Sequence, residues 1–530
     1  MIKLATQVAA EQKTKKSQAI AAASSRGGQI AQKGNNEGAA ACVGCHGLDG
    51  EGNQENGFPR LAGLNAAYLT KQLQAYQKQQ RTNATMAPIA KALKADEIEA
   101  VASYYSRLKP RMGIKQKLEI NPESGKSLAV FGDWVDRGLP ACNQCHGPDG
   151  QGVGSHFPPL AGLPYSYTVQ QIKDWKAGNR KGDPNDMMRV VADKLSTQET
   201  RLVAAYYASL DPMATIQTPG QTKKMAQDEA YPVHTGAIPH HGDVPEPRSV
   251  SESGYFRAPP RSKVPEGPFG DAVRLGEAIF INTQAHPLSS PFVGNQQNCE
   301  GCHLDAGRLA NSSPMWASWV AYPAYRKKNK YVNTMIERIQ GCFKYSMNAQ
   351  GSRAGHPPSA ESEVIVSLVS YFYWLATGAP TGDHRMAGRG YGNLQETAKG
   401  FDPQRGKAVY AEKCSLCHGQ DGQGQYVDGQ IVFPALWGRN SYNWGAGMHK
   451  VDTAGAYIKY NMPLGLPNTL SDQQAWDVAA YMNSHERPQD PRFNGNLQQT
   501  MAKFHNSKFS YYGKRKKPNG KLLGQDAPRQ

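Results

Sequence analysis

The sequence predicts an all-α protein that is built from four small helical domains. Three observations lead to this prediction. A motif of the form Cys-x-x-Cys-His occurs four times along the 530 residues. The first half of the chain contains an internal repeat. Each motif is followed, further along, by a segment with helical periodicity, and a chain of this length is sufficient for three or four compact domains.

Cysteine use is the most informative feature of the composition. Of nine cysteines, all but one stand in pairs two residues apart, and each pair is followed directly by a histidine. A lone Cys-x-x-Cys also occurs in redox dithiols and in zinc sites, but the added histidine, repeated four times, is typical of c-type haem attachment. The sequence therefore predicts four covalently bound haem c groups with iron, in four cytochrome c-like domains. The haem-binding pairs are Cys42 and Cys45, Cys142 and Cys145, Cys299 and Cys302, and Cys414 and Cys417, and the expected proximal iron ligands are His46, His146, His303 and His418.

The first two motifs belong to two copies of one domain. The segment ACVGCHGLDGEG recurs as ACNQCHGPDGQG, and FPRLAGL recurs as FPPLAGL. Each copy ends in an amphipathic helix with a tyrosine pair, and each of these helices is expected to start with a capping box. The tyrosine pairs are Tyr104–Tyr105 and Tyr206–Tyr207, and the expected capping boxes are Asp96 with Glu99 and Ser196 with Glu199.

The second half of the chain predicts two further domains. One surrounds CEGCH and closes with a helix expected over residues 361–376. The other surrounds CSLCH, and its last helix is expected to start at Ser471 with Gln474 completing a capping box. The full set of predicted boundaries is 1–112 for the first domain with its N-terminal extension, 113–211 for the second, 212–268 for a Pro/Gly/His-rich irregular linker, 269–390 for the third and catalytic domain, 391–488 for the fourth, and 489–530 for a basic tail.

Two of these segments leave alternatives open. The linker contains His234, His240 and His241, which could bind a metal, although solvated linker histidines are the simpler interpretation. The tail is polar and basic, with KRKK from Lys514, and is expected to wrap around the protein or to be disordered.

The charge and the targeting signals limit the class of protein. The formal net charge is +16, but Lys and Arg are spread out and no nucleic-acid motif occurs, so no nucleic-acid partner is expected. A basic surface suits a small dianion or an acidic redox partner, and it is also an ordinary solvated surface. No stretch is apolar and long enough for a transmembrane helix. Haem attachment predicts a periplasmic location, although residues 1–34 lack the apolar region of a signal peptide.

Methionines are expected to complete three of the iron sites. Met86, in TMAPIAKAL, precedes the last helix of the first domain. Aligning the tyrosine pairs places Met188 opposite Met86, while Met187 remains an alternative. Met462, in NMPLGLP, precedes the last helix of the fourth domain. Because His/Met ligation raises the potential of the haem and closes its iron to substrates, these three haems are expected to be electron carriers.

The third domain differs from the others. Its methionines, Met335 and Met347, begin no Met-Pro segment, but the segment contains Cys342, the one unpaired cysteine. Such a cysteine is often a small buried hydrophobic residue or a free thiol. Here Arg338 and Lys344, together with Arg326 before them, would favour its thiolate. A thiolate on iron would lower the haem potential and place a nucleophilic sulfur beside an oxidant.

These residues carry a resemblance to known families. IQGCFKYSMN, with GPFGDAVRLGEAIF and CEGCHLDAGR before it, closely resembles the dihaem thiosulfate dehydrogenases, over about residues 265–486. About residues 34–210 resemble tandem dihaem cytochromes c of the c-four type. The chain as a whole looks like a natural fusion of an electron-acceptor cytochrome to a thiosulfate dehydrogenase.

The resemblance implies an activity and an active site. Two thiosulfates would be joined to tetrathionate, and the two released electrons would pass to a downstream periplasmic acceptor. The active haem would have His/Cys ligation by His303 and Cys342, and Arg338 and Ser346 would bind substrate. Arg326 is the expected further arginine of the site, although Lys327 and Lys328 leave its register open. Some family members have a lysine beside the last methionine ligand, where this chain has Asn461.

Other functions remain as alternatives to this interpretation. A pure electron-transfer cytochrome would have no use for Cys342 in a cationic segment. A dihaem peroxidase would need an open iron, whereas the sequence offers ligands for all four. A sulfur-conjugating haem enzyme also fits a cysteine-ligated haem. In any of these cases Arg338 could simply pair with Glu337. The direction of the reaction, tetrathionate formation or reduction, is left open by the sequence.

Overall fold

A computed structural model describes residues 24–111, 118–213, 254–383 and 385–528 of the chain. The predicted all-α class is confirmed, because helices dominate and the named strands of these ranges form only two short antiparallel hairpins. The chain divides into two compact units, Met1–Asp133 with Leu139–Ile216 and Trp134–Gly138 with Gln217–Gln530. Within the described ranges no helix has the length and apolarity needed to cross a membrane. The linker residues His234, His240 and His241 lie outside the described residues.

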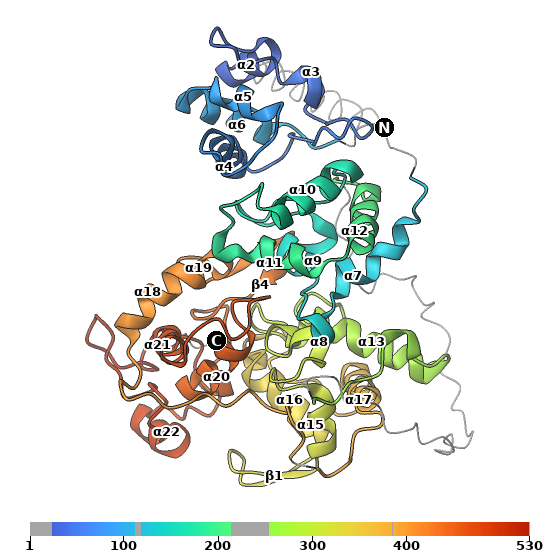
Figure 1. Ribbon diagram of the computed structural model, residues 1–530. Helices are drawn as coiled ribbons and strands as arrows, with labels where there is room; N and C mark the ends of the chain where they lie inside the picture. The colour runs from blue at the N-terminus through green and yellow to red at the C-terminus, as the bar shows by residue number, and fades with distance from the viewer. Residues whose placement is uncertain (1–23, 112–117, 214–253, 384, 529–530) are drawn as a thin grey trace, which may run out of the picture. The chain divides into compact units, whose positions relative to one another are not determined.

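The first domain of the first unit packs its N-terminal helix and its central helix against its last helix. Helices α2 and α4 both contact α6 (Figure 1). The apolar side chains of this contact include Ile30, Leu69 and Ile98, each of which is buried. The helices of this domain are α2 (Arg26–Lys33), α3 (Val43–His46), α4 (Ala66–Gln77), α5 (Met86–Lys91) and α6 (Ala95–Arg107).

The second domain repeats this arrangement. Its central helix α10 packs on its last helix α12, and α12 carries the second tyrosine pair into the core. The short helix α8 (Trp134–Arg137) groups with the second unit. The other helical elements of this domain are η1 (Pro122–Gly125), α7 (Lys126–Phe131), α9 (Cys142–His146), η2 (Pro148–Gly150), α10 (Tyr165–Ala177), η3 (Pro184–Asp186), α11 (Met187–Lys194) and α12 (Thr197–Ser209).

The predicted capping box of the first domain is wrong, whereas that of the second is confirmed. Ser196 accepts the N–H of Glu199, and the Glu199 carboxylate accepts the N–H of Ser196. In the first domain the backbone is extended at Lys94, so α6 begins at Ala95. Glu97, not Glu99, therefore accepts the backbone N–H of the capping residue, and Asp96 is free to pair with Arg26 at 2.6 Å.

Two arginines join the repeats of the first unit in a nearly symmetric way. The Arg81 guanidinium donates to Tyr167 at 2.9 Å and to Gln171 at 2.7 Å. The Arg180 guanidinium, in the second repeat, donates to the equivalent Tyr68 and Gln72 of the first. Each guanidinium also lies 4.7 Å from an aromatic ring of its own repeat. Because tyrosine and amide groups solvate these cations, the two domains can bury them at their contact.

The third domain is built on a helical pair in the second unit. Helix α13 packs closely on α17, because Gly276 has no side chain to meet the carbonyl oxygen of Ser367. Helix α17 corresponds to the helix predicted over residues 361–376. The elements of this domain are η4 (Arg261–Lys263), α13 (Pro268–Ile281), η5 (Ser290–Phe292), η6 (Cys299–Gly301), α14 (Leu304–Gly307), α15 (Met315–Ala321), β1 (Ala324–Arg326), β2 (Tyr331–Asn333), α16 (Met335–Tyr345), η7 (Ala349–Gly351) and α17 (Glu363–Leu375).

The end of the predicted linker packs against this domain. Phe256 and Val264 lie on its apolar core. Arg261 pairs with Glu277 at 2.7 Å and lies 3.6 Å from Asp305. The domain core therefore begins before residue 269, because residues from about 256 onward supply part of its apolar and ionic contacts.

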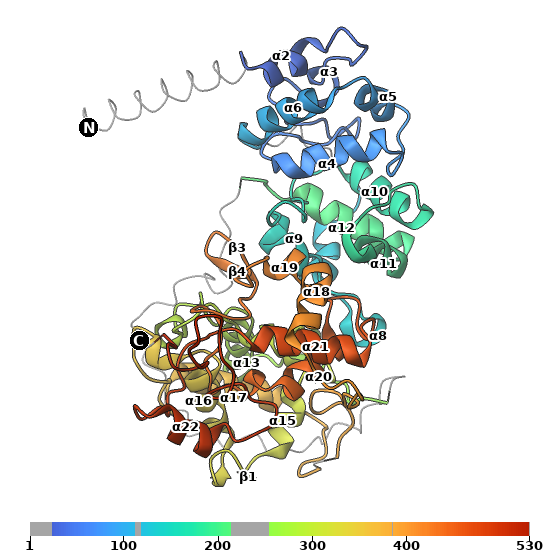
Figure 2. The same cartoon turned by 90° about the vertical axis from the view of Figure 1, so that its left-hand side faces the viewer.

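The fourth domain consists of three packed helices and a hairpin. Helix α21 lies between α18 and α20 (Figures 1 and 2). The predicted capping box at its start is confirmed, because Ser471 and Gln474 exchange both hydrogen bonds. The elements are α18 (Pro403–Lys413), α19 (Ser415–His418), β3 (Gln425–Val427), β4 (Gln430–Phe433), η8 (Gly447–His449), α20 (Val451–Asn461), α21 (Asp472–Asn483) and, in the tail, α22 (Leu497–Phe504).

The basic tail wraps around the fourth domain. Tyr512 and Leu523 are completely buried and form a small core with Trp444. The Tyr512 hydroxyl donates to Gln489, and the Gln489 amide donates to the carbonyl of Gly524. Of the two alternatives for this segment, wrapping is correct for the described residues, because aromatic and aliphatic side chains along the polar sequence supply enough burial to order it.

Candidate haem sites and active site

The four motif histidines share one hydrogen-bonding arrangement. In each case Nδ1 donates to a backbone carbonyl, which leaves Nε2 free to bind a metal. Burial lowers the pKa of each imidazole, and that of His303 falls to about 4, so the neutral form that ligates iron is favoured. The Nδ1 partners are the carbonyl oxygens of Pro59 for His46 at 2.8 Å, Pro158 for His146 at 2.7 Å, Ser313 for His303 at 2.8 Å and Pro434 for His418 at 2.9 Å.

The surroundings of the motifs fit a haem. Burial raises the pKa of the thiols of Cys299, Cys302 and Cys414 to about 12, so these sulfurs lie in apolar surroundings. Three buried arginines, Arg60, Arg308 and Arg487, have guanidinium nitrogens without a partner among the described residues. Carboxylates are the usual partners of such donors, and haem carries two propionates. The donor set and the unpaired cations therefore agree with bound haem c.

The methionines of the first two domains occupy matching places. The N–H of Met86 donates to the side chain of Asn83, and the N–H of Met188 donates to that of Asp183. Beyond each methionine a completely buried alanine faces the core, Ala90 in the first repeat and Ala192 in the second. The matching alanine and the packing of Met188 against the core of its domain favour Met188 as the counterpart of Met86, whereas Met187 is the first residue of α11 as Met86 is of α5.

The methionines of the second unit fall into two groups. Met462 follows α20 directly, is half-buried and packs against the core of the fourth domain. Met335 and Met347 are buried in the core of the third domain, so they fill space there. Beside Met462, Asn461 donates to the carbonyls of Tyr457 and Asn311, which occupies its amide in holding the two domains together.

Cys342 lies on α16, where Arg338 precedes it by one helical turn. Arg338 Nη1 is 2.8 Å from Cys342 Sγ, and the negative charge of this sulfur raises the pKa of Arg338 above its ordinary value. The alternative pairing with Glu337 is not present, because Glu337 forms a capping box with Thr334 at the start of the helix. Lys344 is exposed, and its ammonium lies 5.7 Å from the ring of Tyr345 rather than at the sulfur.

The same sulfur faces the third haem motif. Burial is the main cause of the raised pKa of Cys299 and of Cys302. The electrostatic interaction with Cys342 raises both values further. Arg338 lowers the pKa of His303, so the guanidinium also lies within electrostatic reach of the expected iron ligand. The structure thus brings Cys342 and Arg338 together with the third motif, as the sequence led us to expect.

Three hydrogen bonds hold the end of α16. The carbonyl of Lys344 accepts from the Asn443 amide at 3.0 Å, and that of Tyr345 accepts from the Asn443 backbone N–H at 3.2 Å. The carbonyl of Ser346 accepts from the Asn295 amide at 2.7 Å. Helix ends leave carbonyls unpaired, so these bonds satisfy groups that would otherwise need water. They also place Ser346, one turn after Cys342, at a defined position.

Further cations surround the end of this helix. Arg326, on β1, donates to the Tyr322 hydroxyl at 2.6 Å. The Lys328 ammonium donates to the carbonyl of Gly445 and lies 3.5 Å from the centre of the Tyr345 ring. Burial of the ammonium, together with the charges of Arg492, Arg338 and Arg326, lowers the pKa of Lys328 to about 7. Arg326 therefore belongs to the cationic group near the site, and Lys328 belongs to it as well.

Sequence reasoning did not assign a role to several residues around the site. Asn443, Asn295 and Tyr345 support α16, and Tyr391 interacts electrostatically with Cys302, Arg338 and Cys342. Arg492, from the basic tail, has its guanidinium 5.1 Å from the Tyr345 ring. Asn295, Asn443, Tyr391 and Arg492 come from parts of the chain that carry no motif, so no local pattern could have identified them, whereas Tyr345 lies in the segment IQGCFKYSMN that carries the resemblance.

The fold and these sites define a multihaem c-type cytochrome with covalently bound haem. The family model described as "Cytochrome c" matches residues 24–109 and 136–211, and the model described as "Cytochrome C oxidase, cbb3-type, subunit III" matches residues 401–482. Both matches are to haem domains. They cover three of the four predicted motifs, and the third domain, with Cys342, lies between them.

Comparison with known proteins identifies the family. The chain is 51% identical over 273 residues to the thiosulfate dehydrogenase of Stutzerimonas stutzeri (strain A1501), which covers 51% of this chain and 85% of that protein. It is 44% identical over 173 residues to the thiosulfate dehydrogenase electron acceptor of Thiomonas intermedia (strain K12), covering 32% of this chain and 79% of that protein. The solved thiosulfate dehydrogenase (TsdBA) of Marichromatium purpuratum matches with a TM-score of 0.85 at 48% identity, covering 95% of this chain and 99% of that one. The chain belongs to the thiosulfate dehydrogenase family.

The packing of Tyr345 yields a prediction about Gly445. A side-chain carbon on Gly445 would lie 2.4 Å from the Tyr345 ring, so Gly445→Ala must displace the ring at the end of α16. We expect Gly445→Ala to lower turnover roughly ten-fold, since small displacements of reacting groups are costly. Gly447→Ala is the matched control, because nothing lies within 4 Å of the added carbon there. Equal steady-state rates for the two variants would show that this packing is irrelevant to catalysis.

Proposed function

We propose that the protein is a tetrahaem thiosulfate dehydrogenase, which joins two thiosulfates to tetrathionate with release of two electrons. The observation that carries this proposal is the contact between Arg338 and Cys342 beside the third haem motif. In it, the one cysteine without an attachment role lies next to a cation, and that cation interacts electrostatically with His303. Membership of the thiosulfate dehydrogenase family supports the same assignment.

The charges around Cys342 suit the substrate. Thiosulfate is a small dianion, and bringing two of them together costs Coulomb repulsion that cations in a partly buried site can offset. Arg338, Arg326 and Lys328 supply such cations. In this proposal Arg338 and Ser346 bind substrate oxygens, and Arg326 and Lys328 add to the positive field. The Arg338 guanidinium also lies 2.8 Å from the Cys342 sulfur.

Cys342 and His303 would hold the iron of the third haem. When bound there, haem supplies a one-electron acceptor next to the substrate sulfur. Protein side chains would position the reactants. Arg338 orients the Cys342 sulfur, and the end of α16 fixes the position of Ser346. The cationic side chains offset the repulsion between the two thiosulfate anions. Two roles remain for the sulfur, a permanent ligand or one that leaves iron to bond with substrate sulfur.

The other three haems would carry electrons. Met86, Met188 and Met462 would complete the sites of His46, His146 and His418, which closes those irons to substrate. Thiosulfate and tetrathionate are then the substrate and product, and a further acceptor in the periplasm would take the electrons. The alternative of a pure electron-transfer cytochrome lacks a reason for the Arg338–Cys342 contact.

The experiment that tests the proposal is an anaerobic assay with thiosulfate that follows haem reduction and tetrathionate together. The haems should become reduced as tetrathionate forms, in a ratio of two electrons to each tetrathionate. Haem reduction without tetrathionate would indicate another sulfur reaction. Absence of both would leave the electron-transfer alternative.

The haem number gives a first prediction of this proposal. Because all four motifs have a free histidine Nε2 and a buried cysteine environment, intact mass should show four covalent haems per chain. A haem-stained denaturing gel is the supporting measurement. A mass equal to the chain with two or three haems would contradict the tetrahaem assignment.

Substitution of Cys342 gives the sharpest prediction. Cys342→Met should keep a six-coordinate iron with a much higher potential, yet stop tetrathionate formation, because the thiolate is lost. Cys342→Gly should open the third iron to exogenous ligands. Electron paramagnetic resonance of the oxidised protein, paired with activity, is the measurement. If the wild type lacks a thiolate-type low-spin signal, or if Cys342→Gly turns over thiosulfate at the wild-type rate, Cys342 is only a packing residue.

The pKa of Lys328 predicts a pH dependence of substrate binding. Because this pKa is lowered to about 7, the side chain is cationic below that pH and becomes neutral as the pH rises through it. We therefore expect the KM for thiosulfate to rise between about pH 6 and pH 9. Lys328→Arg should abolish this rise, because arginine stays charged throughout the range. Lys327→Arg is the control, and the same flattening in both variants would contradict the assignment to Lys328.

A further inference from the structure

The basic tail reaches the active-site helix through Arg492. The Arg492 guanidinium lies 5.1 Å from the centre of the Tyr345 ring, on α16, and 4.1 Å from the ring of Phe504 in the tail itself. Tyr345 stands between Cys342 and Ser346, the two residues of α16 that the proposed function places at the substrate. We propose that Arg492 is a positioning residue of the thiosulfate site, which it serves by fixing Tyr345. This inference rests on the proposed function.

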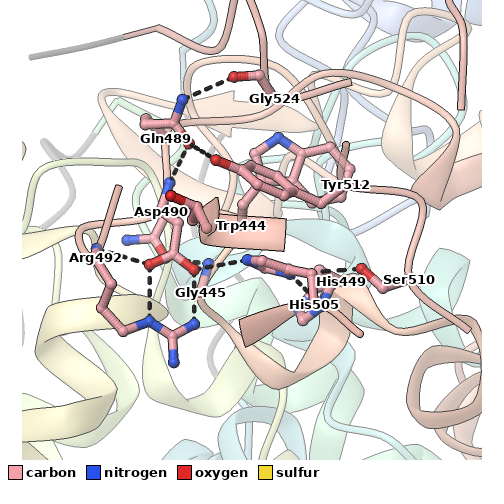
Figure 3. A network of polar contacts seen from close by, with 12 residues as sticks. Trp444, Gly445, His449, Gln489, Asp490, Arg492, His505, Ser510, Tyr512 and Gly524 are labelled. Carbon is pink, nitrogen blue, oxygen red and sulfur yellow. Dashed lines mark hydrogen bonds and ion pairs between the residues drawn. The ribbon is translucent and has the colours of Figure 1, made fainter. Parts of the chain in front are cut away.

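Arg492 is itself held rigidly. Its Nε and Nη2 donate to the two carboxylate oxygens of Asp490 at 2.9 and 2.6 Å, a paired geometry that fixes the plane of the guanidinium (Figure 3). The Asp490 side chain is completely buried and also accepts from His505 Nε2 at 2.8 Å. Although burial opposes ionisation, these hydrogen bonds hold the pKa of Asp490 well below its usual range. The carboxylate that orients Arg492 is therefore permanently charged near neutral pH.

The network continues into the fourth domain, so the tail is anchored on both sides of Arg492. His505 Nδ1 lies 3.1 Å from His449 Nε2, and the His505 ring stacks on Tyr512 at 4.2 Å (Figure 3). His449 Nδ1 in turn bonds to the carbonyl of Ala446. Since all of these groups are buried, displacement of the tail would leave several polar atoms unpaired, which opposes such movement.

Tyr345 is the residue of α16 that this network contacts through Arg492. Its ring lies between the Lys328 ammonium, the Arg492 guanidinium and the backbone of Gly445. Its own carbonyl accepts from the N–H of Asn443. The ring is thereby restrained by the hairpin of the third domain, the fourth domain and the tail. A shift of Tyr345 would move this helix end, in which Cys342 lies three residues before Tyr345 and Ser346 directly after it.

Positioning fits Arg492 better than direct contact with substrate. Its side chain is 14% exposed, and its charge is neutralised by Asp490 at 2.6 Å. Two of its three nitrogens already donate to that carboxylate. Among the cations near Tyr345, Arg492 is thus the one with a buried acid as its partner, whereas Lys328 donates to a backbone carbonyl and Arg326 to a tyrosine hydroxyl.

The test compares two arginines of the same tail in the full-length, haem-loaded protein. Arg515 lies 5.1 Å from the Tyr511 ring, which is the same distance as that from Arg492 to Tyr345, but its ring belongs to the tail itself. We expect Arg492→Gln to lower kcat for thiosulfate roughly ten- to hundred-fold with little change of KM. It should also split or broaden the thiolate-type paramagnetic resonance signal of the third haem. Arg515→Gln should change neither.

The outcomes separate this proposal from others. A rise of KM alone in Arg492→Gln would make Arg492 a substrate-binding residue and would overturn positioning. An unchanged kcat with an unchanged signal would also overturn it. A wild-type protein that does not oxidise thiosulfate would instead refute the proposed function. The resonance signal, which needs no substrate, would still report whether Arg492 orders the Cys342 helix.

A second set of variants guards against simple misfolding of the tail. Tyr345→Phe keeps the ring and should behave as wild type, whereas Tyr345→Leu removes it and should reproduce the loss in Arg492→Gln. If Arg492 acts through Tyr345, the double variant Arg492→Gln/Tyr345→Leu should be no slower than Tyr345→Leu alone. Fully additive losses would show that Arg492 acts by another route, and the proposal would fail.

Discussion

The hydrogen bonds that hold the end of α16 are the interaction on which the proposed active site depends. Asn443 and Asn295 bind three successive carbonyls, those of Lys344, Tyr345 and Ser346. A helix end without such partners frays, and a frayed end would move the cysteine that lies one turn before it. Because Asn443 belongs to the fourth domain, the geometry at the third haem motif is set by the contact between two domains of the same unit. The third domain, which holds the proposed active site, is therefore incomplete without its neighbour.

The four predicted haem sites are alike on the histidine side and differ on the other. A backbone carbonyl binds Nδ1 of each motif histidine, so each ring is held in the same tautomer with Nε2 free. In the first, second and fourth domains a methionine stands at the start or the end of a helix. In the third domain, helix α16, which starts with its own capping box, carries Cys342 and Arg338 in place of such a methionine. One scaffold thus provides sites suited to electron transfer and one site suited to reaction with an anion.

The tail shows how a polar segment can contribute to such a site. Few of its residues are apolar, yet Tyr512 and Leu523 are completely buried with Trp444. The buried carboxylate of Asp490 would be costly alone, but Arg492 and His505 neutralise it. The same ion pair directs the guanidinium onto Tyr345. The arginines that join the two repeats of the first unit use related chemistry, because Arg81 and Arg180 are buried against tyrosines and amides.

The sequence by itself determined what depends on local spacing. The four motifs and their histidines could be read directly, because haem attachment needs two cysteines and a histidine within five residues. The repeat, the helical class and two of three capping boxes followed from periodicity and from short-range hydrogen bonds. The third box failed because the extended backbone at Lys94 moved the helix start by two residues, so that Glu97 took the role expected of Glu99.

The tertiary structure alone decided what surrounds Cys342. The sequence pointed to this cysteine because it is unpaired, and to Arg338 because it lies four residues before it in the segment that carries the resemblance. It could not show that Lys344 faces away while Lys328 faces the site, nor that Asn295, Asn443 and Arg492 converge on one helix end. The described part of the tail also proved to be packed rather than disordered. These contacts join residues far apart in the chain, and their free energy comes from burial and hydrogen bonds that form only when the domains have packed together.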